Sequence, residues 1–522
     1  MRWSDGIAER TRAWGAGFFR TLAVPALLAV AMSGVTRAED PPNAAASRES
    51  ASRSAARVLE RAVVEAIAKA EASVVAIARF RTDGPNDISN AQLSPRSLGT
   101  GGIPTFGPDQ HVPAEMAAAV VIDRQGHLLT NYHVLGDPRR NRYVVLVGQG
   151  ANETVQVLDV DQVRAGDPWT DLAVLQVDGG DWEPITWGDA REVRKGQFVI
   201  SLGNPYQIAR DGQVSASWGM ISHLSRAIPR DEGHSDPPPA REMLYDYGGL
   251  IQTDARLNMG TSGGPLINLD GEMIGLTTAL ATLEGFEDSM GFAIPVDESF
   301  RRTVDSLQAG RQPEFGFLGV APRDLSQTLQ QQGRQGVLVA HVVPATPAAA
   351  ANIRKDDILT RLNNLTLRDS QMLMCELGKM APGETVELTL ERGAQRGERG
   401  REVRTTAVLS KRHIPSARRA FAQQEDPRWR GLTIDYATAV LPPDQLQPAL
   451  ESGAPASTLA VRDVHPESPA WAAGMRPGAL VTHVEDRRVA TPEEFHEAVA
   501  LLDGEVQLRL ATDDPRTLTI SD

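Results

Sequence analysis

The stretch Gly260-Thr261-Ser262-Gly263-Gly264-Pro265-Leu266 decides how this chain is interpreted. It lies between two apolar runs, 250–253 and 273–276, which predicts a tight loop between two β-strands. The glycines around Ser262 allow unusual backbone angles and close approach of neighbouring segments. An acyl-transfer nucleophile needs such a loop, because backbone N–H groups must face the oxygen that becomes negative. Taken alone, the motif more often marks a Gly/Ser-rich hairpin without chemistry.

Two further segments supply the partners that a serine nucleophile needs. His133 ends a strand-like apolar run that begins at Leu128, and Asp171 stands directly before the run 172–175. A histidine can act as a base near neutral pH, and a buried carboxylate fixes its tautomer. The chain order His133, Asp171, Ser262 is that of chymotrypsin-type double β-barrels. We therefore predict a Ser-His-Asp triad, with the amides of Gly260 and Ser262 forming the oxyanion hole.

The remaining histidines predict no further chemistry. They form no HxxxH pattern and no Cys/His cluster, so we expect no metal site, and we expect no cofactor. We interpret these nine residues as surface or loop positions: His111, His127, His223, His234, His341, His413, His465, His483 and His496.

The first 38 residues read as a secretory signal. Four arginines precede the apolar run 22–32, and Thr36-Arg37-Ala38 offers a small-residue cleavage site. The run is shorter than the ~20 apolar residues that cross a membrane, so we expect cleavage, with an uncleaved membrane anchor as the alternative. The single cysteine, Cys375, excludes a disulfide within the chain.

The charge of the chain argues against a nucleic-acid partner. The net charge is −14, and residues 1–38 carry five basic and two acidic side chains, so the chain without them has a net charge of −17. No basic stripe offsets this acidity.

The C-terminal part contains a degenerate repeat. Pro344-Ala345-Thr346-Pro347-Ala348 matches Pro466-Glu467-Ser468-Pro469-Ala470, and Arg354 and Arg476 follow at the same spacing. Each copy is predicted to contain a strand, a short helix, a strand, a second helix and a final strand. In the second copy, Thr491-Pro492-Glu493-Glu494 has a capping residue, a proline and a glutamate where a helix should begin. The repeat resembles a pair of PDZ domains.

Together these segments resemble the HtrA/DegP-like serine proteases, an extracytoplasmic quality-control family with C-terminal PDZ domains. The similar strings are Thr130-Asn131-Tyr132-His133-Val134, Thr170-Asp171-Leu172-Ala173, Ile251-Gln252-Thr253-Asp254-Ala255 with 260–266, Leu202-Gly203-Asn204-Pro205, and Gly291-Phe292-Ala293-Ile294-Pro295. The resemblance covers roughly residues 54–522. Thr261 stands where the family usually has Asn, and its β-branched side chain is expected to bias the oxyanion loop toward one peptide orientation.

The resemblance implies a mainly β fold: a chymotrypsin-like double β-barrel followed by two α+β PDZ modules. We predict a signal peptide (1–38), a disordered leader (39–53), a trypsin-like serine protease domain (54–300), a first PDZ domain (313–411), a linker (412–427) and a second PDZ domain (428–522). Helical spacing is expected over 55–70, and the first strand over 73–78. In the first PDZ module, the resemblance places the peptide-binding loop at Phe317, Leu318, Gly319 and Val320. The matching loop of the second module begins at Trp429, and Arg430 replaces an apolar residue there.

The function implied by the resemblance is a periplasmic or otherwise extracytoplasmic, ATP-independent serine endopeptidase that degrades unfolded or damaged proteins under PDZ control. It would act as a homotrimer or larger homo-oligomer and bind peptide C-termini at the first PDZ module. The alternative is a catalytically silent PDZ-bearing chaperone or adaptor. Residues 257–259 and the loop 278–284 would wall the primary specificity pocket and favour an apolar residue before the cleaved bond.

Overall fold

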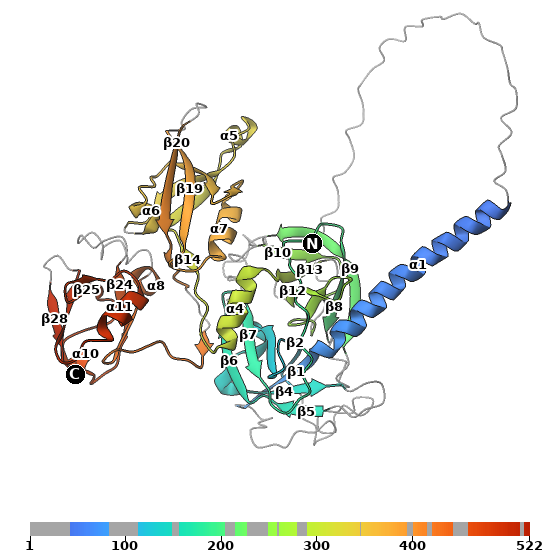
Figure 1. The fold of residues 1–522 in the computed structure, drawn as a ribbon, viewed down its shortest axis with the longest axis horizontal. Coiled ribbons are helices and arrows are strands. Elements are labelled where there is room, and N and C mark those ends of the chain that lie inside the picture. Colours follow the sequence, from blue (N-terminus) through green and yellow to red (C-terminus); the bar gives the residue numbers. More distant parts are fainter. Residues whose placement is uncertain are drawn as a thin grey trace, which may run out of the picture. The chain divides into compact units, whose positions relative to one another are not determined.

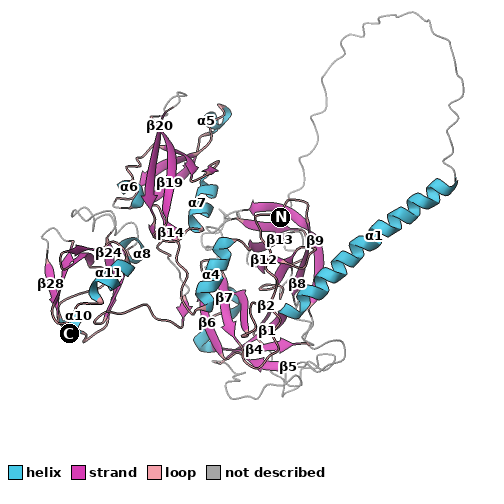
Figure 2. Cartoon of the chain, viewed as in Figure 1, coloured by secondary structure: helices cyan, strands magenta, loops and turns pink. Residues whose placement is uncertain are grey.

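The computed structural model describes residues 42–82, 113–148, 156–203, 214–226, 249–257, 260–278, 290–344, 346–393, 400–414, 420–441, 458–511 and 516–521 (Figure 1). Residues 1–58 and 59–522 form separate units, and every site discussed below lies in the second. Figure 2 shows that strands predominate in this part of the chain. The predicted mainly β fold is confirmed.

The first half of the peptidase region is an antiparallel sheet in the order β22-β6-β7-β3-β2-β1-β4-β5. Its strands bury Val, Ile, Leu and Ala side chains on both faces. They are β1 (Val74–Arg81), β2 (Glu115–Val121), β3 (His127–Asn131), β4 (Asn141–Val147), β5 (Gln156–Asp159), β6 (Gln162–Asp167), β7 (Leu172–Gln176) and β22 (Phe421–Ala422). A one-turn helix, α2 (Tyr132–Leu135), follows β3.

The second half closes into a barrel in the order β10-β13-β12-β11-β8-β9. Its strands are β8 (Phe198–Gly203), β9 (Ser215–Arg226), β10 (Leu250–Thr253), β11 (Pro265–Ile267), β12 (Met273–Thr278) and β13 (Gly291–Pro295). Ser262 lies between strands β10 and β11, so the predicted loop between two strands is present. Helix α4 (Glu298–Gln308) then leaves the barrel, and the Asp297 carboxylate caps it by accepting the Phe300 N–H.

The two C-terminal modules repeat one plan, as the sequence predicts. The first contains β15 (Val320–Asp324), β16 (Val337–Val342), α6 (Pro347–Ala350), β17 (Ile358–Leu362), α7 (Ser370–Gly378), β19 (Thr385–Arg392) and β20 (Arg401–Val408). The second contains β23 (Leu432–Tyr436), α8 (Ala437–Val440), β24 (Leu459–Val464), α10 (Pro469–Ala472), β25 (Leu480–Val484), α11 (Pro492–Val499), β27 (Val506–Leu510) and β28 (Thr517–Ile520). The smaller elements are η1 (Glu71–Ser73), η2 (Pro138–Arg140), β14 (Gly316–Phe317), α5 (Gln327–Gln331), β18 (Leu365–Thr366), β21 (Ser410–Lys411) and β26 (Arg487–Arg488).

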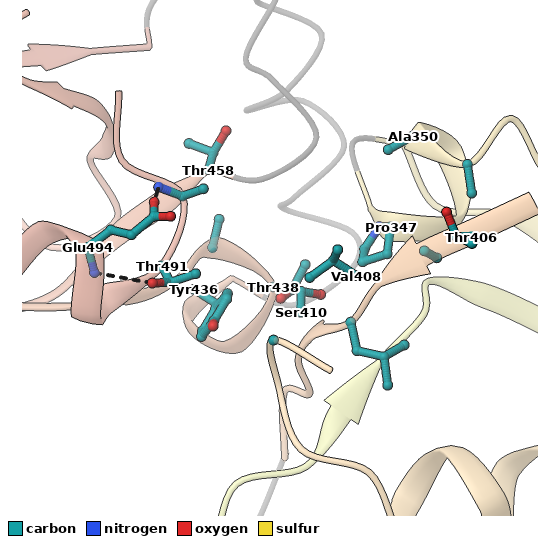
Figure 3. Close-up of a pocket in the computed structure, with 16 residues that line it drawn as sticks. Pro347, Ala350, Thr406, Val408, Ser410, Tyr436, Thr438, Thr458, Thr491 and Glu494 are labelled. Carbon is teal, nitrogen blue, oxygen red and sulfur yellow. Dashed lines mark hydrogen bonds between the residues drawn. The ribbon is translucent and has the colours of Figure 1, made fainter. Parts of the chain in front are cut away.

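The predicted cap of α11 is present. Thr491 Oγ1 accepts the Glu494 N–H at 3.2 Å, and the Glu494 carboxylate accepts the Ala490 N–H at 2.7 Å (Figure 3). The first bond satisfies a donor that a helix start leaves unpaired, and the second fixes the residue before the cap to the first turn.

Two sequence predictions need correction. Residues 42–53 are not a disordered leader, because α1 (Pro42–Ala70) already begins at residue 42. The segment is rich in alanine, the strongest helix former, and proline is well suited to the first helical turn, so low hydrophobicity there does not prevent a helix. The predicted linker 412–427 contains a strand, β22, that joins the first sheet.

Residues 1–38, the predicted signal, lie outside the described residues. Within the part that the structure describes, no helix is long and apolar enough to cross a membrane.

Candidate active site

The predicted histidine and aspartate lie in direct contact. Strands β3 and β7 pair with Asn131, the last residue of β3, opposite Leu172, the first residue of β7. Asp171, directly before β7, therefore lies close to His133, two residues after β3. His133 Nδ1 lies 3.0 and 2.9 Å from the two carboxylate oxygens of Asp171. The His133 backbone N–H also donates to Asp171 Oδ1 at 3.0 Å. The two side chains are only 10% and 3% exposed, so little water competes for these bonds.

The backbone of Asp171, like its carboxylate, accepts two or more hydrogen bonds. Asp171 has φ +57°, in the left-handed region that Asp tolerates better than most residues. Its carbonyl accepts the Tyr132 N–H at 2.9 Å and the Asn131 side-chain amide at 3.2 Å. The strained angle is therefore retained by bonds from the two residues that precede His133.

The Ser262 loop is pressed between the two halves of the peptidase region. The Ala118 N–H donates to the Ser262 carbonyl at 2.9 Å. Gly263 has φ +83°, and a Cβ there would lie 2.2 Å from the Ala118 carbonyl oxygen. A Cβ on Gly264 would lie 2.0 Å from the Leu202 carbonyl oxygen. Both glycines are thus required by close backbone approach.

Two consecutive threonines at the end of β12 connect this loop with the aspartate. Thr277 Oγ1 lies 2.6 Å from the Thr261 carbonyl oxygen, and the Thr277 carbonyl accepts the Gly263 N–H at 3.0 Å. Thr278 Oγ1 donates to Asp171 Oδ2 at 3.2 Å. From the sequence, Thr278 is expected only in the wall of the specificity pocket. The sequence signal for this role is a pair of polar residues at the end of an apolar strand. Both threonines are fully buried in the structure.

The orientation of the Thr261–Ser262 peptide follows from these bonds. The Thr261 carbonyl accepts the Gly264 N–H at 3.0 Å and faces the Thr277 hydroxyl, so it points into the loop. In a trans peptide the N–H points opposite to the carbonyl. The Ser262 N–H is therefore directed away from the loop interior. Gly260, the other predicted oxyanion donor, has φ +96°.

Only part of the predicted specificity pocket is described. Asn258, Met259 and residues 279–284 lie outside the described residues. Leu257 is buried and packs closely on the backbone of β13, because a Cβ on Gly291 would lie 2.5 Å from Leu257 Cδ1.

A second buried carboxyl group lies four residues before Asp171. Asp167 accepts the Thr170 N–H and hydroxyl at 2.9 and 2.7 Å and the Trp169 N–H at 3.3 Å. Burial raises the pKa of Asp167 to about 6, although the Thr170 bonds oppose that rise. The side chain therefore fixes the turn that presents Asp171.

The interpretation of the other histidines as surface or loop residues is wrong for His127. This residue begins β3, its side chain is 14% exposed, and its Nδ1 lies 2.6 Å from Asp123 Oδ2. The pair also meets the Gln308 amide on α4. His223, His341, His483 and His496 likewise lie on strands or a helix. Across the described ranges, no group of three or more His, Cys, Asp or Glu side chains is placed to hold a metal ion.

In the first PDZ module, the predicted peptide-binding loop leads into a sheet edge. Phe317 pairs with Ser410, Leu318 is buried, and β15 begins at Val320 as the edge strand of its sheet. Gly319 has φ +90°, and a Cβ there would lie 2.0 Å from Thr346 Oγ1. An edge strand that follows a glycine-containing loop is the arrangement that receives an added peptide strand.

In the second PDZ module, the matching loop is closed on itself. The Leu432 N–H donates to the Trp429 carbonyl at 2.8 Å, and the Trp429 N–H donates back at 2.9 Å. Arg430 has φ +49°, and its guanidinium donates to the carbonyls of Gly504 and Ile520. Since the Leu432 amide is already used, this loop has fewer donors for a peptide carboxylate.

Figure 3 shows a cavity of about 460 Å³ that contains none of the predicted site residues. Its lining includes Pro347, Ala350, Val408, Tyr436, Thr438 and Glu494. Neither His133 nor Ser262 lines it, and its lining residue Ser410 donates to the Phe317 carbonyl at 3.2 Å.

Comparisons with known proteins agree with this geometry. The trypsin-like peptidase domain family matches residues 117–276, and PDZ domain families match residues 316–403 and 461–511. A DegP-like periplasmic serine endoprotease of Halomonas elongata is 29% identical over 408 residues, which is 76% of each chain. The counterpart from Chlamydia trachomatis is 27% identical over 81% of this chain and 77% of its own, and that from Brucella suis is 29% identical over 75% and 69%. The predicted resemblance to HtrA/DegP-like serine proteases is confirmed.

Proposed function

We propose that this chain, a trypsin-like serine endopeptidase with two PDZ domains, cleaves peptide bonds through Ser262, His133 and Asp171. The observation that carries the proposal is the contact of His133 Nδ1 with both carboxylate oxygens of Asp171. A carboxylate at Nδ1 favours the tautomer with the proton on that nitrogen, which leaves Nε2 as the base. Nε2 would take the Ser262 hydroxyl proton as Oγ attacks the carbonyl, and would then return it to the leaving amine.

The amides of Gly260 and Ser262 would stabilise the oxyanion. The pinned Thr261 carbonyl supports this role for Ser262, because it turns the Ser262 N–H away from the loop interior. Charge that develops on the substrate oxygen is stabilised most by donors that are already oriented. Thr261 stands where the family usually has Asn, and its β-branched side chain, stiff at χ1, would favour one orientation of this peptide.

The substrates would be unfolded or damaged proteins outside the cytoplasm. The relatives are named periplasmic, and residues 1–38 would direct export. The first PDZ module would bind peptide C-termini at Phe317 to Val320, since its edge strand β15 begins there. A tethered C-terminus would raise the effective concentration of the rest of the substrate at Ser262. A homotrimer or larger homo-oligomer would place several such sites together.

Digestion of unfolded casein by the mature wild-type protein and by Ser262→Ala tests the proposal. We expect loss of about 10⁴-fold or more in the variant, with the fold unchanged by circular dichroism. A catalytically silent chaperone or adaptor predicts that neither protein digests casein. Equal digestion by both would show that another residue is the nucleophile.

A further inference from the structure

The segment between the two PDZ modules contributes a strand to the peptidase sheet. In β22, Phe421 pairs with Gly166 and Ala422 with Ala165, both on β6. Without β22, β6 would be the edge of this sheet in the described chain, with unpaired backbone groups. We call residues 420–424 the strap.

Hydrogen bonds on both sides hold the strap in place. The Gln423 N–H donates to the Arg164 carbonyl at 3.1 Å, and the Gln424 N–H donates to the Gly310 carbonyl at 2.9 Å. The Gln312 side chain donates to the Phe421 carbonyl at 2.6 Å and lies 3.2 Å from the Gly166 carbonyl. Since Gln312 precedes the first PDZ module and Phe421 follows it, the two connections of that module are fixed to the same strand.

The ring of Phe421 lies in the space that a side chain at position 166 would fill, and we call this space the seat. Gly166 has no side chain, and a Cβ there would lie 2.4 Å from Phe421 Cζ. The ring also stacks on Tyr132, with centroids 5.7 Å apart and planes at 27°. The ring therefore packs against both the strand and the residue that precedes His133.

His133 and Asp171 are each connected to the residues that contact the Phe421 ring. Tyr132 neighbours His133 in α2, and its N–H donates to the Asp171 carbonyl. On the other side, β6 ends at Asp167, whose carboxyl fixes the turn that presents Asp171.

The turn 168–171 also contacts the chain segments that enter and leave the first PDZ module. Trp169 packs against Phe315 and Ile414, and the Arg412 guanidinium lies 4.4 Å from the centroid of its ring. Packing of this kind resists movement because close-packed interiors lose attractive contacts when a gap opens.

We propose that Phe421, although it lies far beyond the peptidase domain in sequence, is a positioning residue that keeps His133 and Asp171 paired. It acts through Tyr132 and through the docking of β22 on β6, and it touches neither substrate nor the reacting atoms. Detachment of the strap from β6 therefore lowers kcat and leaves KM unchanged. This inference rests on the roles proposed above for His133, Asp171 and Ser262.

The test uses the full chain and a short chromogenic peptide with an apolar residue before the cleaved bond. Phe421→Ala removes the ring, and Gly166→Ala displaces it by filling its seat. The control is Phe198→Ala, which removes a stack of similar ring geometry, on Trp218 with centroids 5.5 Å apart, from the exposed surface of the barrel. Melting temperatures and the rate of fluorophosphonate labelling are measured alongside kcat and KM.

We expect about a tenfold loss of kcat in Phe421→Ala and in Gly166→Ala, with KM within about twofold and labelling slowed in parallel. The double variant should be no slower than Gly166→Ala, because the ring has already left its seat. Phe421→Leu, which refills part of the seat, should recover most of kcat, and Phe198→Ala should match wild type.

Three results would overturn the role of Phe421. These are a kcat within twofold of wild type in Phe421→Ala, a loss of activity fully accounted for by the unfolded fraction, or losses that add independently in the double variant. Because Phe421→Ala introduces no overpacking, it decides the matter even if Gly166→Ala fails to fold. Failure of the proposed function is seen separately, as activity that survives in Ser262→Ala.

Discussion

Among single residues, Thr278 has a role that no sequence motif marks. Its hydroxyl, at the end of β12, donates to the carboxylate of Asp171 across the two halves of the peptidase region. A hydrogen bond to a charged group in a buried site contributes about 1.5–3 kcal/mol. Loss of this bond should therefore weaken the support that Asp171 gives to His133 when the histidine becomes charged.

We predict that Thr278→Val, which keeps the shape of the side chain, lowers kcat about tenfold and leaves KM nearly unchanged. The reason is that the lost bond stabilises the charged pair and not the bound substrate. The control is Thr360→Val in the first PDZ module, where the hydroxyl donates to the Thr389 carbonyl at 3.1 Å. Steady-state kinetics on a short peptide decide the prediction, and an unchanged kcat in Thr278→Val would refute it.

Asp167 gives a prediction on pH. Its folded pKa, about 6, lies above the ordinary value of 3.8. The folded state therefore binds this proton more tightly than the unfolded state, and the contribution to stability is fully present below pH ~3.8 and lost as the pH rises through about 6. A difference of this size corresponds to about 3 kcal/mol.

The measurement is urea unfolding of wild type and Asp167→Asn at several pH values from 4 to 7. We expect the free energy of unfolding of wild type to fall relative to the variant as the pH rises. Other carboxyl groups contribute equally to both proteins, so they cancel in the difference. A difference that stays constant with pH would mean that the pKa of Asp167 is not raised.

Among the elements, the loop between β10 and β11 depends on glycine for two different reasons. A positive φ alone costs a non-glycine residue about 1–2 kcal/mol, whereas a collision with backbone cannot be relieved by a rotamer change. Gly263 combines both constraints, since it has φ +83° and faces the Ala118 carbonyl.

We predict that Gly263→Ala reduces kcat/KM at least a hundredfold, because the loop must shift to accommodate the Cβ. The matched control is Gly179→Ala, where φ is +82° and no atom lies within 4 Å of the position of the new Cβ. It should keep kcat/KM within about twofold. Equal effects of the two substitutions would show that the backbone angle, and not the close approach, sets the cost.

The elements that the sequence predicts well are those with a local pattern. The apolar runs around 250–253 and 273–276, the helix cap at Thr491 and the PDZ repeat all correspond to elements of the structure. The contact of His133 with Asp171 is also predictable, because both residues lie at predicted strand ends and follow the chain order of chymotrypsin-type proteases. The individual roles of these residues stay predictions until they are tested.

What the sequence could not show depends on contacts between distant segments. Strand β22 has only two residues, too few for a recognisable alternation of apolar and polar side chains. It forms because β6 offers an open sheet edge. The pair of His127 with Asp123 looks like loop sequence until β3 brings it against α4. Composition does not reveal the start of α1, because a segment of low hydrophobicity can still have strong helix propensity.

In the whole molecule, the two PDZ modules share a plan but differ at the loop that would receive a peptide. The first has an edge strand after Gly319, and the second has Leu432 and Trp429 bonded to each other. Control of turnover by peptides should therefore pass through the first module.

We predict that a peptide ending in an apolar residue binds the first module and raises turnover of a short chromogenic substrate. Gly319→Ala should abolish both effects, since its Cβ would collide with Thr346 Oγ1. Gly333→Ala is the control in the same module, with φ +75° and open space around the new Cβ. Fluorescence anisotropy of a labelled peptide and parallel rate measurements provide the readout. Stimulation that persists in Gly319→Ala would remove this loop from the account.

All the predictions on turnover depend on Ser262 as the nucleophile and on His133 as the base that activates it. The most direct measurement is mass-spectrometric mapping of the covalent adduct formed by a fluorophosphonate, which Ser Oγ attacks with loss of fluoride. We predict a single adduct on Ser262 in wild type, none in Ser262→Ala, and labelling slowed by several orders of magnitude in His133→Ala. An adduct on another residue, or labelling of Ser262 at the wild-type rate without His133, would contradict the account.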